Sequence, residues 1–250
     1  MKLPQSWSDI TVEQFIELST LDTTGGSYSY NSEALSVLCD IPLEDIEDID
    51  IEDMSDLMQE LDFTKSQPKN SFKNELLDLT IKPIGKLTLY EYIDLEHYFA
   101  NDYVKNLAII AGIRYKHTEV DKFSNLIYEP YSYSPKDRQD LFLELPVTEV
   151  YGLINEFLQY RDKFLKTYEN LFNPEGEEDL TPKEKLEMDP EEVKEIEQTK
   201  KSTKWSWELM IYNLCGGDLT KYEALGELPL VLVFNTVSYT HLTLPTNREV

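Results

Sequence analysis

The chain contains 250 residues, of which 41% are hydrophobic, and it carries a formal net charge of −25 at pH 7. A surface this acidic repels phosphate groups, so we expect no binding to nucleic acid or to anionic membranes. The same charge favours solubility or a basic partner, and the length suffices for one sizeable core or two smaller ones.

Targeting and redox features favour a cytoplasmic protein. The first seven residues are too short and polar for a signal peptide, and no apolar run approaches the ~20 residues of a membrane helix. Cys39 and Cys215 are far apart in the sequence and make no disulfide framework. We therefore expect reduced thiols in a core.

The N-terminal part of the chain is expected to be helical. Thr11 and Gln14 have the spacing of a capping box within a helix predicted for Trp7–Leu21. A loop is expected over residues 23–31, after which Ser32 would cap a short helix.

Residues 40–62 hold eleven acidic residues and no lysine or arginine, yet their apolar positions still repeat. This pattern predicts two short acidic helices joined near residues 48–51. The functional alternative is a calcium site made by Asp48, Asp50 and Glu52. An EF-hand loop needs glycine at its sixth position and glutamate at its twelfth, and neither occurs here, so we favour a solvated acidic face.

Short strands are expected on either side of the middle of the chain. Residues 72–82 alternate imperfectly between apolar and polar, which predicts a β-hairpin turning near Asn74–Glu75. The segment Ile127–Tyr131 could add a third short strand.

The central stretch, Leu87–Tyr115, is predicted to be a buried helical hairpin. Thr88 and Glu91 have the spacing of a capping box for a helix that ends near Phe99. Asp102 can cap the second helix, whose evenly apolar sequence indicates burial on more than one side.

Helices are again predicted after residue 133. Ser134 followed by a proline marks a helix start, and that helix should stop before Pro146. Residues 147–172 carry an apolar stripe at alternating threes and fours, which predicts the longest helix of the chain. Residues 173–201 are rich in Glu and Lys and lack aromatic residues, as in an acidic flexible linker.

The C-terminal element is expected to contain three helices over residues 202–236. The first ends at Gly216–Gly217, Asp218 caps the second, and Pro229 opens the third over Leu230–Phe234. Residues 237–250 change character and resemble the translation of a sequencing adapter, so we expect an artefact that cuts off the last helix; the alternative is a genuine C-terminal strand. The predicted fold is therefore mainly α with a small β-hairpin, comprising a helical body over 1–172, the linker and this element.

The sequence contains no familiar catalytic or cofactor motif. It has no phosphate-binding glycine loop, nucleophile elbow, CxxC or HExxH. Asp94 and His97 have metal-ligand spacing, but a carboxylate-bridged metal site in a helical bundle needs paired Glu-x-x-His motifs. We therefore expect no enzyme, no cofactor and no metal.

Aromatic residues are the remaining candidates for function. The chain has sixteen tyrosines and three tryptophans, and both types suit protein interfaces because they combine apolar area with a polar tip. The alternative for any one of them is a place at the edge of the core. The candidate partner-binding residues are Tyr92, Tyr98, Tyr103, Trp205 and Trp207.

The order of these features resembles a family of tailed-phage proteins, described as tail assembly chaperones or as uncharacterised virion-associated proteins. The resemblance is carried by W-x-D-I-T-x-x-Q-F from Trp7, TLYEYIDLEHYF from Thr88, AIIAGIRY from Ala108 and WSWELMIYNLCGGDLTKYEALGELPLVLVFN from Trp205. It implies a non-enzymatic protein that binds helical apolar segments of a tape-measure-like tail protein in the host cytoplasm.

Two alternatives to the chaperone role remain. One is a structural virion component of the tail or baseplate, which would stay in purified particles. The other, ranked last, is an enzyme or metal-binding protein. The oligomeric state is left open.

Overall fold

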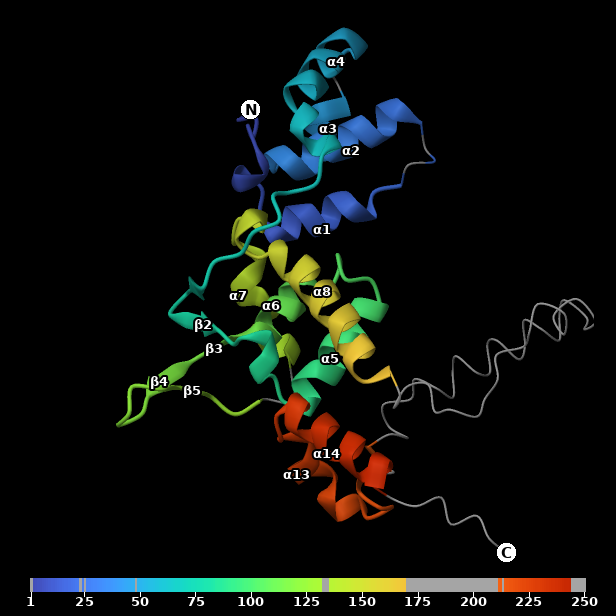
Figure 1. The fold of residues 1–250 in the computed structure, drawn as a ribbon. Coiled ribbons are helices and arrows are strands. Elements are labelled where there is room, and N and C mark those ends of the chain that lie inside the picture. The colour runs from blue at the N-terminus through green and yellow to red at the C-terminus, as the bar shows by residue number, and fades with distance from the viewer. Residues whose placement is uncertain are drawn as a thin grey trace, which may run out of the picture. The chain divides into compact units, whose positions relative to one another are not determined.

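A computed structural model of the chain describes residues 2–22, 24, 26–47, 49–131, 135–169, 211–212 and 214–243. The described residues are mainly helical, with two small antiparallel sheets, which confirms the predicted fold class. Figure 1 shows the order of these elements along the chain.

The residues divide into two compact units. Unit 1 comprises Met1–Ile84 and Asp94–Leu158, and unit 2 comprises Gly85–Ile93 and Gln159–Val250. Two helices, α5 (Leu89–Ala100) and α8 (Gly152–Thr167), contribute residues to both units. The expected boundary at residue 172 and the linker 173–201 lie outside the described residues.

The first helix is set by the predicted capping box. Thr11 Oγ1 accepts a hydrogen bond from Gln14 N (3.1 Å), and Gln14 Oε1 accepts one from Thr11 N (3.0 Å), so α1 covers Val12–Thr20. Trp7 lies before this helix in a separate 3-10 turn, where its indole Nε1 donates to Ser66 O at 2.9 Å. The N-terminal boundary of the predicted helix was therefore five residues too early.

The second helix is longer than predicted. Helix α2 runs over Ser27–Cys39 and begins after Gly26, whose φ of 93° ends the preceding loop. Ser32 lies inside this helix, where its hydroxyl donates to Tyr28 O (3.0 Å), so its prediction as an N-cap was wrong. A serine can satisfy its hydroxyl on the preceding helical turn, which makes it an ambiguous start signal.

The two acidic helices are confirmed as α3 (Leu43–Glu47) and α4 (Ile51–Glu60). Asp50 caps α4 by accepting hydrogen bonds from Glu52 N (2.9 Å) and Asp53 N (3.0 Å). Helix α2 packs against α1, α3 and α4 in this part of unit 1 (Figure 1). The carboxylate of Asp50 thus has a structural role at a helix N-terminus.

A three-stranded sheet stands where a hairpin was predicted. Its strands are β1 (Glu75–Leu76), β2 (Leu79–Ile81) and β3 (Tyr115–Lys116), in the order β1-β2-β3. The turn lies at Leu77–Asp78, with φ values of 52° and 60°, so the predicted turn at Asn74–Glu75 was wrong. Positive φ at both central residues is the geometry that suits a two-residue hairpin.

The central helices follow the prediction closely. Thr88 N donates to Glu91 Oε2 (2.8 Å) and Glu91 N donates to Thr88 Oγ1 (3.3 Å), which confirms the capping box of α5. Helix α6 covers Leu107–Arg114, and every residue in it is buried. Asp102 does not cap α6, because its carboxylate accepts from Val104 N and Lys105 N in the turn before that helix.

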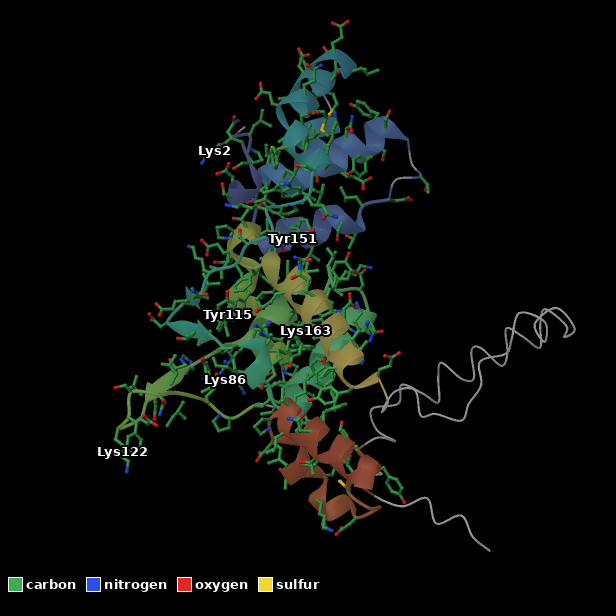
Figure 2. The ribbon with its side chains drawn as sticks, in the orientation of Figure 1. Lys2, Lys86, Tyr115, Lys122, Tyr151 and Lys163 are labelled. Carbon is green, nitrogen blue, oxygen red and sulfur yellow. The ribbon has the colours of Figure 1, made fainter. Side chains whose placement is uncertain are left out.

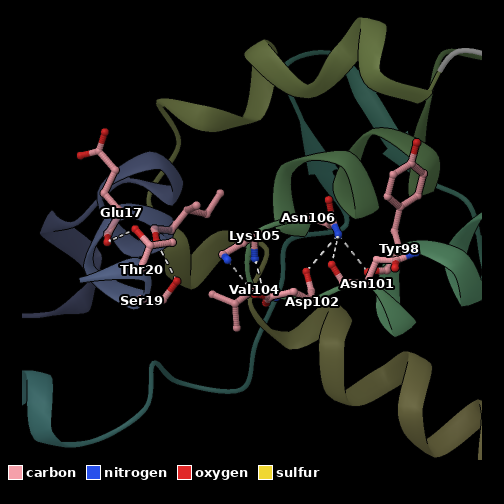
Figure 3. Close-up of polar contacts among 10 residues, drawn as sticks. Glu17, Ser19, Thr20, Tyr98, Asn101, Asp102, Val104, Lys105 and Asn106 are labelled. Carbon is pink, nitrogen blue, oxygen red and sulfur yellow. Dashed lines mark hydrogen bonds and ion pairs between the residues drawn. The ribbon is translucent and has the colours of Figure 1, made fainter. Parts of the chain in front are cut away.

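Asn106 closes the connection between α5 and α6 (Figure 3). Its side-chain Nδ2 lies 3.1 Å from Tyr98 O and 3.0 Å from both Asn101 O and Asp102 O. The Tyr98 carbonyl belongs to the last turn of α5 and the other two directly follow it, in a region where backbone acceptors lack partners within the helix. One amide therefore stabilises the tight connection between the two helices.

Arg114, at the end of α6, is the largest side chain that is fully buried in the described chain, with 1% of its surface exposed. Its Nε and Nη2 donate to Lys82 O at 3.2 and 3.1 Å, and its Nη1 lies 2.8 Å from Glu156 Oε2. The guanidinium therefore joins the end of β2 to α6 and α8.

The predicted long helix 147–172 begins later than expected. Val147–Glu149 forms a 3-10 turn, and the α-helix α8 starts at Gly152 and ends at Thr167. Two distant partners hold the earlier segment out of the helix: Val147 N donates to Ile10 O, and Gly152 N donates to Ser71 O, both at 2.9 Å. The preceding helix α7 covers Gln139–Leu143 and ends before Pro146, as predicted.

Unit 2 contains α13 (Tyr222–Gly226) and α14 (Leu230–Thr243). Gly216 and Gly217 have positive φ as predicted, and Asp218 accepts from Thr220 N (3.1 Å) before α13. Helix α14 continues to Thr243 and so runs into residues 237–250, the segment that resembles a translated adapter. Aromatic side chains pack together in the core of unit 2. The ring of Phe164 lies 4.7 to 5.3 Å, between centroids, from the rings of Tyr92, Tyr168 and Phe234.

Gly152 offers a test of the packing in unit 1. A Cβ added there would lie 2.7–2.8 Å from three backbone atoms of Ser71, whereas one added at Gly85 meets nothing within 4 Å. Alanine gains at most ~1 kcal/mol in helix propensity, and overpacking costs about 1–3 kcal/mol. We expect Gly152→Ala to lower the free energy of unfolding in urea and Gly85→Ala to leave it nearly unchanged. Equal effects of the two substitutions would contradict this packing.

Candidate partner-binding surface

Several exposed large apolar side chains lie together in one β-hairpin of unit 1, formed by β4 (Thr118–Val120) and β5 (Leu126–Tyr128). These strands pair only with each other, so the segment predicted as a third strand belongs to a separate sheet. Asp121 organises the turn, accepting at Oδ1 from Phe123 N (2.7 Å) and Asn125 N (2.8 Å). The hydrogen bond from the Asn125 side chain, with these backbone bonds, lowers the pKa of the Asp121 carboxyl.

The hairpin presents large apolar side chains to solvent. The exposed fractions are 66% for Val120, 71% for Phe123, 45% for Leu126 and 52% for Ile127. Figure 2 shows Lys122 at the tip of the same hairpin. Four such side chains within eight residues concentrate exposed apolar surface on one small hairpin, and a concentration of this kind marks an interaction surface.

The pairing register gives the hairpin two different faces. Val120 lies opposite Leu126, so their side chains share one face. Glu119 lies opposite Ile127, and their side chains share the other. One face is therefore apolar, and the other combines an apolar residue with a carboxylate.

The base of the hairpin is fixed to unit 1 by charged and aromatic contacts. Glu129 forms an ion pair with Arg138 and accepts a hydrogen bond from His117 N at 3.1 Å. Lys116 Nζ lies 4.6 Å from the ring centroid of Tyr131, whose hydroxyl donates to the carboxylate of Asp94. Because side-chain contacts hold the base of the hairpin, the apolar side chains at its tip can stay exposed without packing against the rest of unit 1.

The pKa values of the two carboxyls at this base are shifted in opposite directions. Burial raises the pKa of Asp94, which the hydrogen bond from Tyr131 and the charge of His97 only partly offset. Burial would also raise the pKa of Glu129, but the hydrogen bond and charge of Arg138 and the His117 N–H outweigh it, so this pKa is lowered. Glu129 therefore stabilises the hairpin base as an anion.

A second surface feature of unit 1 is a groove of about 700 Å³ between α1 and the end of α2. Gln14 Nε2 donates to Val37 O (3.0 Å) and Ser36 Oγ donates to Ile41 O (2.6 Å), so these polar groups along it are satisfied within the chain. Its rim carries Glu13, Glu17 and Asp40. Across the described ranges, no group of three or more His, Cys, Asp or Glu residues is placed to hold a metal ion.

Three of the five aromatic candidates lie among the described residues, and their surroundings differ. Tyr92 is fully buried in unit 2, so it lines a core instead of a surface. Tyr98 is half-buried, and Tyr103 is 39% exposed and stacks on Phe99 at 6.0 Å between ring centroids. Trp205 and Trp207 lie outside the described residues.

The hairpin was missed as a site by sequence reasoning. Its strands have only three residues each, too few for a clear alternation signal. A weak signal was available in Asp121–Asn125, whose polar and small residues surround Phe123 and are typical of a turn between apolar strands.

Comparison of the chain with protein-family models, with curated proteins and with solved structures found no match. No described helix combines the length and the hydrophobicity that crossing a membrane requires. The resemblance to tailed-phage proteins therefore stays an expectation from the sequence.

The Glu129–Arg138 pair predicts a pH-dependent contribution to stability. A carboxyl whose pKa falls on folding stabilises above its unfolded value, here about 4.5, and that contribution is lost as the pH falls through the lower folded value. At pH 7 we expect Glu129→Gln to lower the free energy of unfolding by up to about 1 kcal/mol, the usual limit for such pairs. The deficit should vanish well below pH 4.5.

The control for this measurement is Glu119→Gln, which changes an exposed acid of the same hairpin. It should have little effect at either pH. A Glu129→Gln deficit that is the same at both pH values would show that the ion pair does not hold the base.

Proposed function

We propose that this protein is a non-enzymatic assembly chaperone of the tailed-phage type, which binds apolar segments of a tape-measure-like tail protein. The observation that carries the proposal is the uncovered apolar hairpin, with Val120 and Phe123 about two-thirds exposed. A two-stranded hairpin is marginal in water unless another element covers it. A partner polypeptide would provide that cover.

The charge of the chain supports the same role. A protein that carries an exposed apolar patch risks self-association, and a net charge of −25 opposes contact between two copies. The same charge would keep a complex with an aggregation-prone tail protein in solution. An apolar binding element on a strongly acidic protein thus suits a chaperone.

The test is co-expression with a tape-measure-like tail protein. The wild-type chain should raise the soluble fraction of that protein and co-purify with it. The double variant Val120→Ser/Phe123→Ser should lose co-purification, because removing two large apolar contacts weakens binding by more than about tenfold.

A matched control is Leu141→Ser/Leu158→Ser, which changes two exposed leucines outside the hairpin. It should behave as the wild type, since isolated surface substitutions shift stability by only about 0.5 kcal/mol. No gain in solubility with the wild-type chain would contradict the chaperone role. Stoichiometric retention of the chain in purified particles would instead favour the structural virion component.

A further inference from the structure

We propose that the β4–β5 hairpin binds its partner by strand addition, taking an extended segment of alternating apolar and basic residues along the outer edge of β5. This inference rests on the proposed function and specifies how the partner is held at the hairpin. It follows from the register of the two strands, from the chemistry of their two faces and from the charge of the chain.

The register leaves backbone groups of β5 facing outward. Glu129 N donates to His117 O, and Asp121 N donates to Asn125 O, both at 3.0 Å. Residue pairs along an antiparallel ladder alternate between bonded and non-bonded, so the Val120–Leu126 pair between them is a non-bonded one. The N–H and C=O of Leu126 therefore point away from β4.

The outer edge of β5 is the accessible one. Among the described strands, β4 alone pairs with β5. The outer edge of β4 instead begins beside β2, where Thr118 Oγ1 lies 3.2 Å from Thr80 Oγ1. Edge strands are normally protected by charges, proline or a covering element. Strand β5 has the apolar side chains of Leu126 and Ile127 where a protected edge would carry charges or proline.

The two faces determine the chemistry of the added strand. Successive side chains of a strand lie on opposite faces, so an alternating segment would place one set beside each face of the hairpin. Apolar residues would extend the Val120–Leu126 face, and lysine or arginine would lie on the face that carries Glu119. On this face the added strand lies beside Ile127, and Glu119 is one strand further, about 10 Å away at two strand spacings. The long side chain of lysine or arginine can bridge most of that distance, and the net charge of −25 attracts a basic segment in the same way.

A second copy of the chain is the less suitable occupant. The hairpin segment 118–129 has three acidic residues and one lysine, and the whole chain carries −25. Two copies that each carry this charge repel one another. A basic partner segment has the complementary charge.

The experiment uses the full chain and an acetylated, amidated heptapeptide, Lys-Val-Lys-Val-Lys-Val-Lys, in titration calorimetry at near-physiological salt. A second peptide has the same sequence but is N-methylated at two adjacent central residues, so that one methyl group blocks each edge. We expect the first peptide to bind and the methylated one to bind at least about tenfold more weakly, because charge and side chains are unchanged but backbone pairing is lost.

The protein variant is Leu126→Pro, paired with Leu126→Val as the control. The Leu126 N–H faces outward, and proline is tolerated at such an edge position, so the fold should survive, as the melting temperature can verify. Leu126→Pro should weaken binding of the first peptide by about tenfold, whereas Leu126→Val, which keeps the N–H, should not.

Strand addition is overturned if the first peptide does not bind, if both peptides bind equally, or if Leu126→Pro binds as the wild type.

Co-expression separates the two proposals. Should Leu126→Pro still solubilise the tape-measure-like protein as well as the wild type, strand addition is wrong and the chaperone role stands. If the wild-type chain binds the peptide but fails to solubilise that protein, the chaperone role is wrong and strand addition stands. A dimer in light scattering that Leu126→Pro converts to monomer would identify a second copy as the occupant and overturn the basic partner.

Discussion

The buried guanidinium of Arg114 is the interaction on which the arrangement of unit 1 depends. It donates twice to the carbonyl of Lys82 and pairs with Glu156, so one side chain joins β2, α6 and α8. Removing one partner from such a buried set leaves a charge without compensation, which is far more destabilising than the loss of a surface pair. The position of β3, which follows Arg114 directly, is therefore fixed by this side chain.

Strand β3, once fixed, determines where the β4–β5 hairpin projects from the rest of unit 1. Lys116 contacts the ring of Tyr131, and Glu129 pairs with Arg138, so both ends of the hairpin are held at the base. The tip needs no contacts of its own and can expose Phe123 and its neighbours. A rigid base with an uncovered apolar tip loses little conformational entropy when a partner binds, which favours affinity.

Local signals in the sequence predicted local structure well. The capping boxes at Thr11 and Thr88 were found because their partners lie three residues away, and the buried character of α6 followed from its evenly apolar sequence. The pairing of β2 with β3 was missed because it joins residues more than thirty positions apart. The late start of α8 was missed for the same reason, since Ser71 and Ile10 hold the preceding segment out of the helix. The hairpin was missed as a site because its exposure depends on which elements fail to cover it, a property that short strands do not reveal in sequence.

The central claim is that this chain holds another polypeptide through its exposed hairpin. Amide hydrogen exchange measured by mass spectrometry over residues 117–129 tests it most directly, with the free chain compared with its purified complex with the tape-measure-like protein. The account predicts exchange that slows by more than about tenfold in this segment on binding, as uncovered strands become protected. Unchanged exchange over 117–129, with protection elsewhere in the chain, would contradict it.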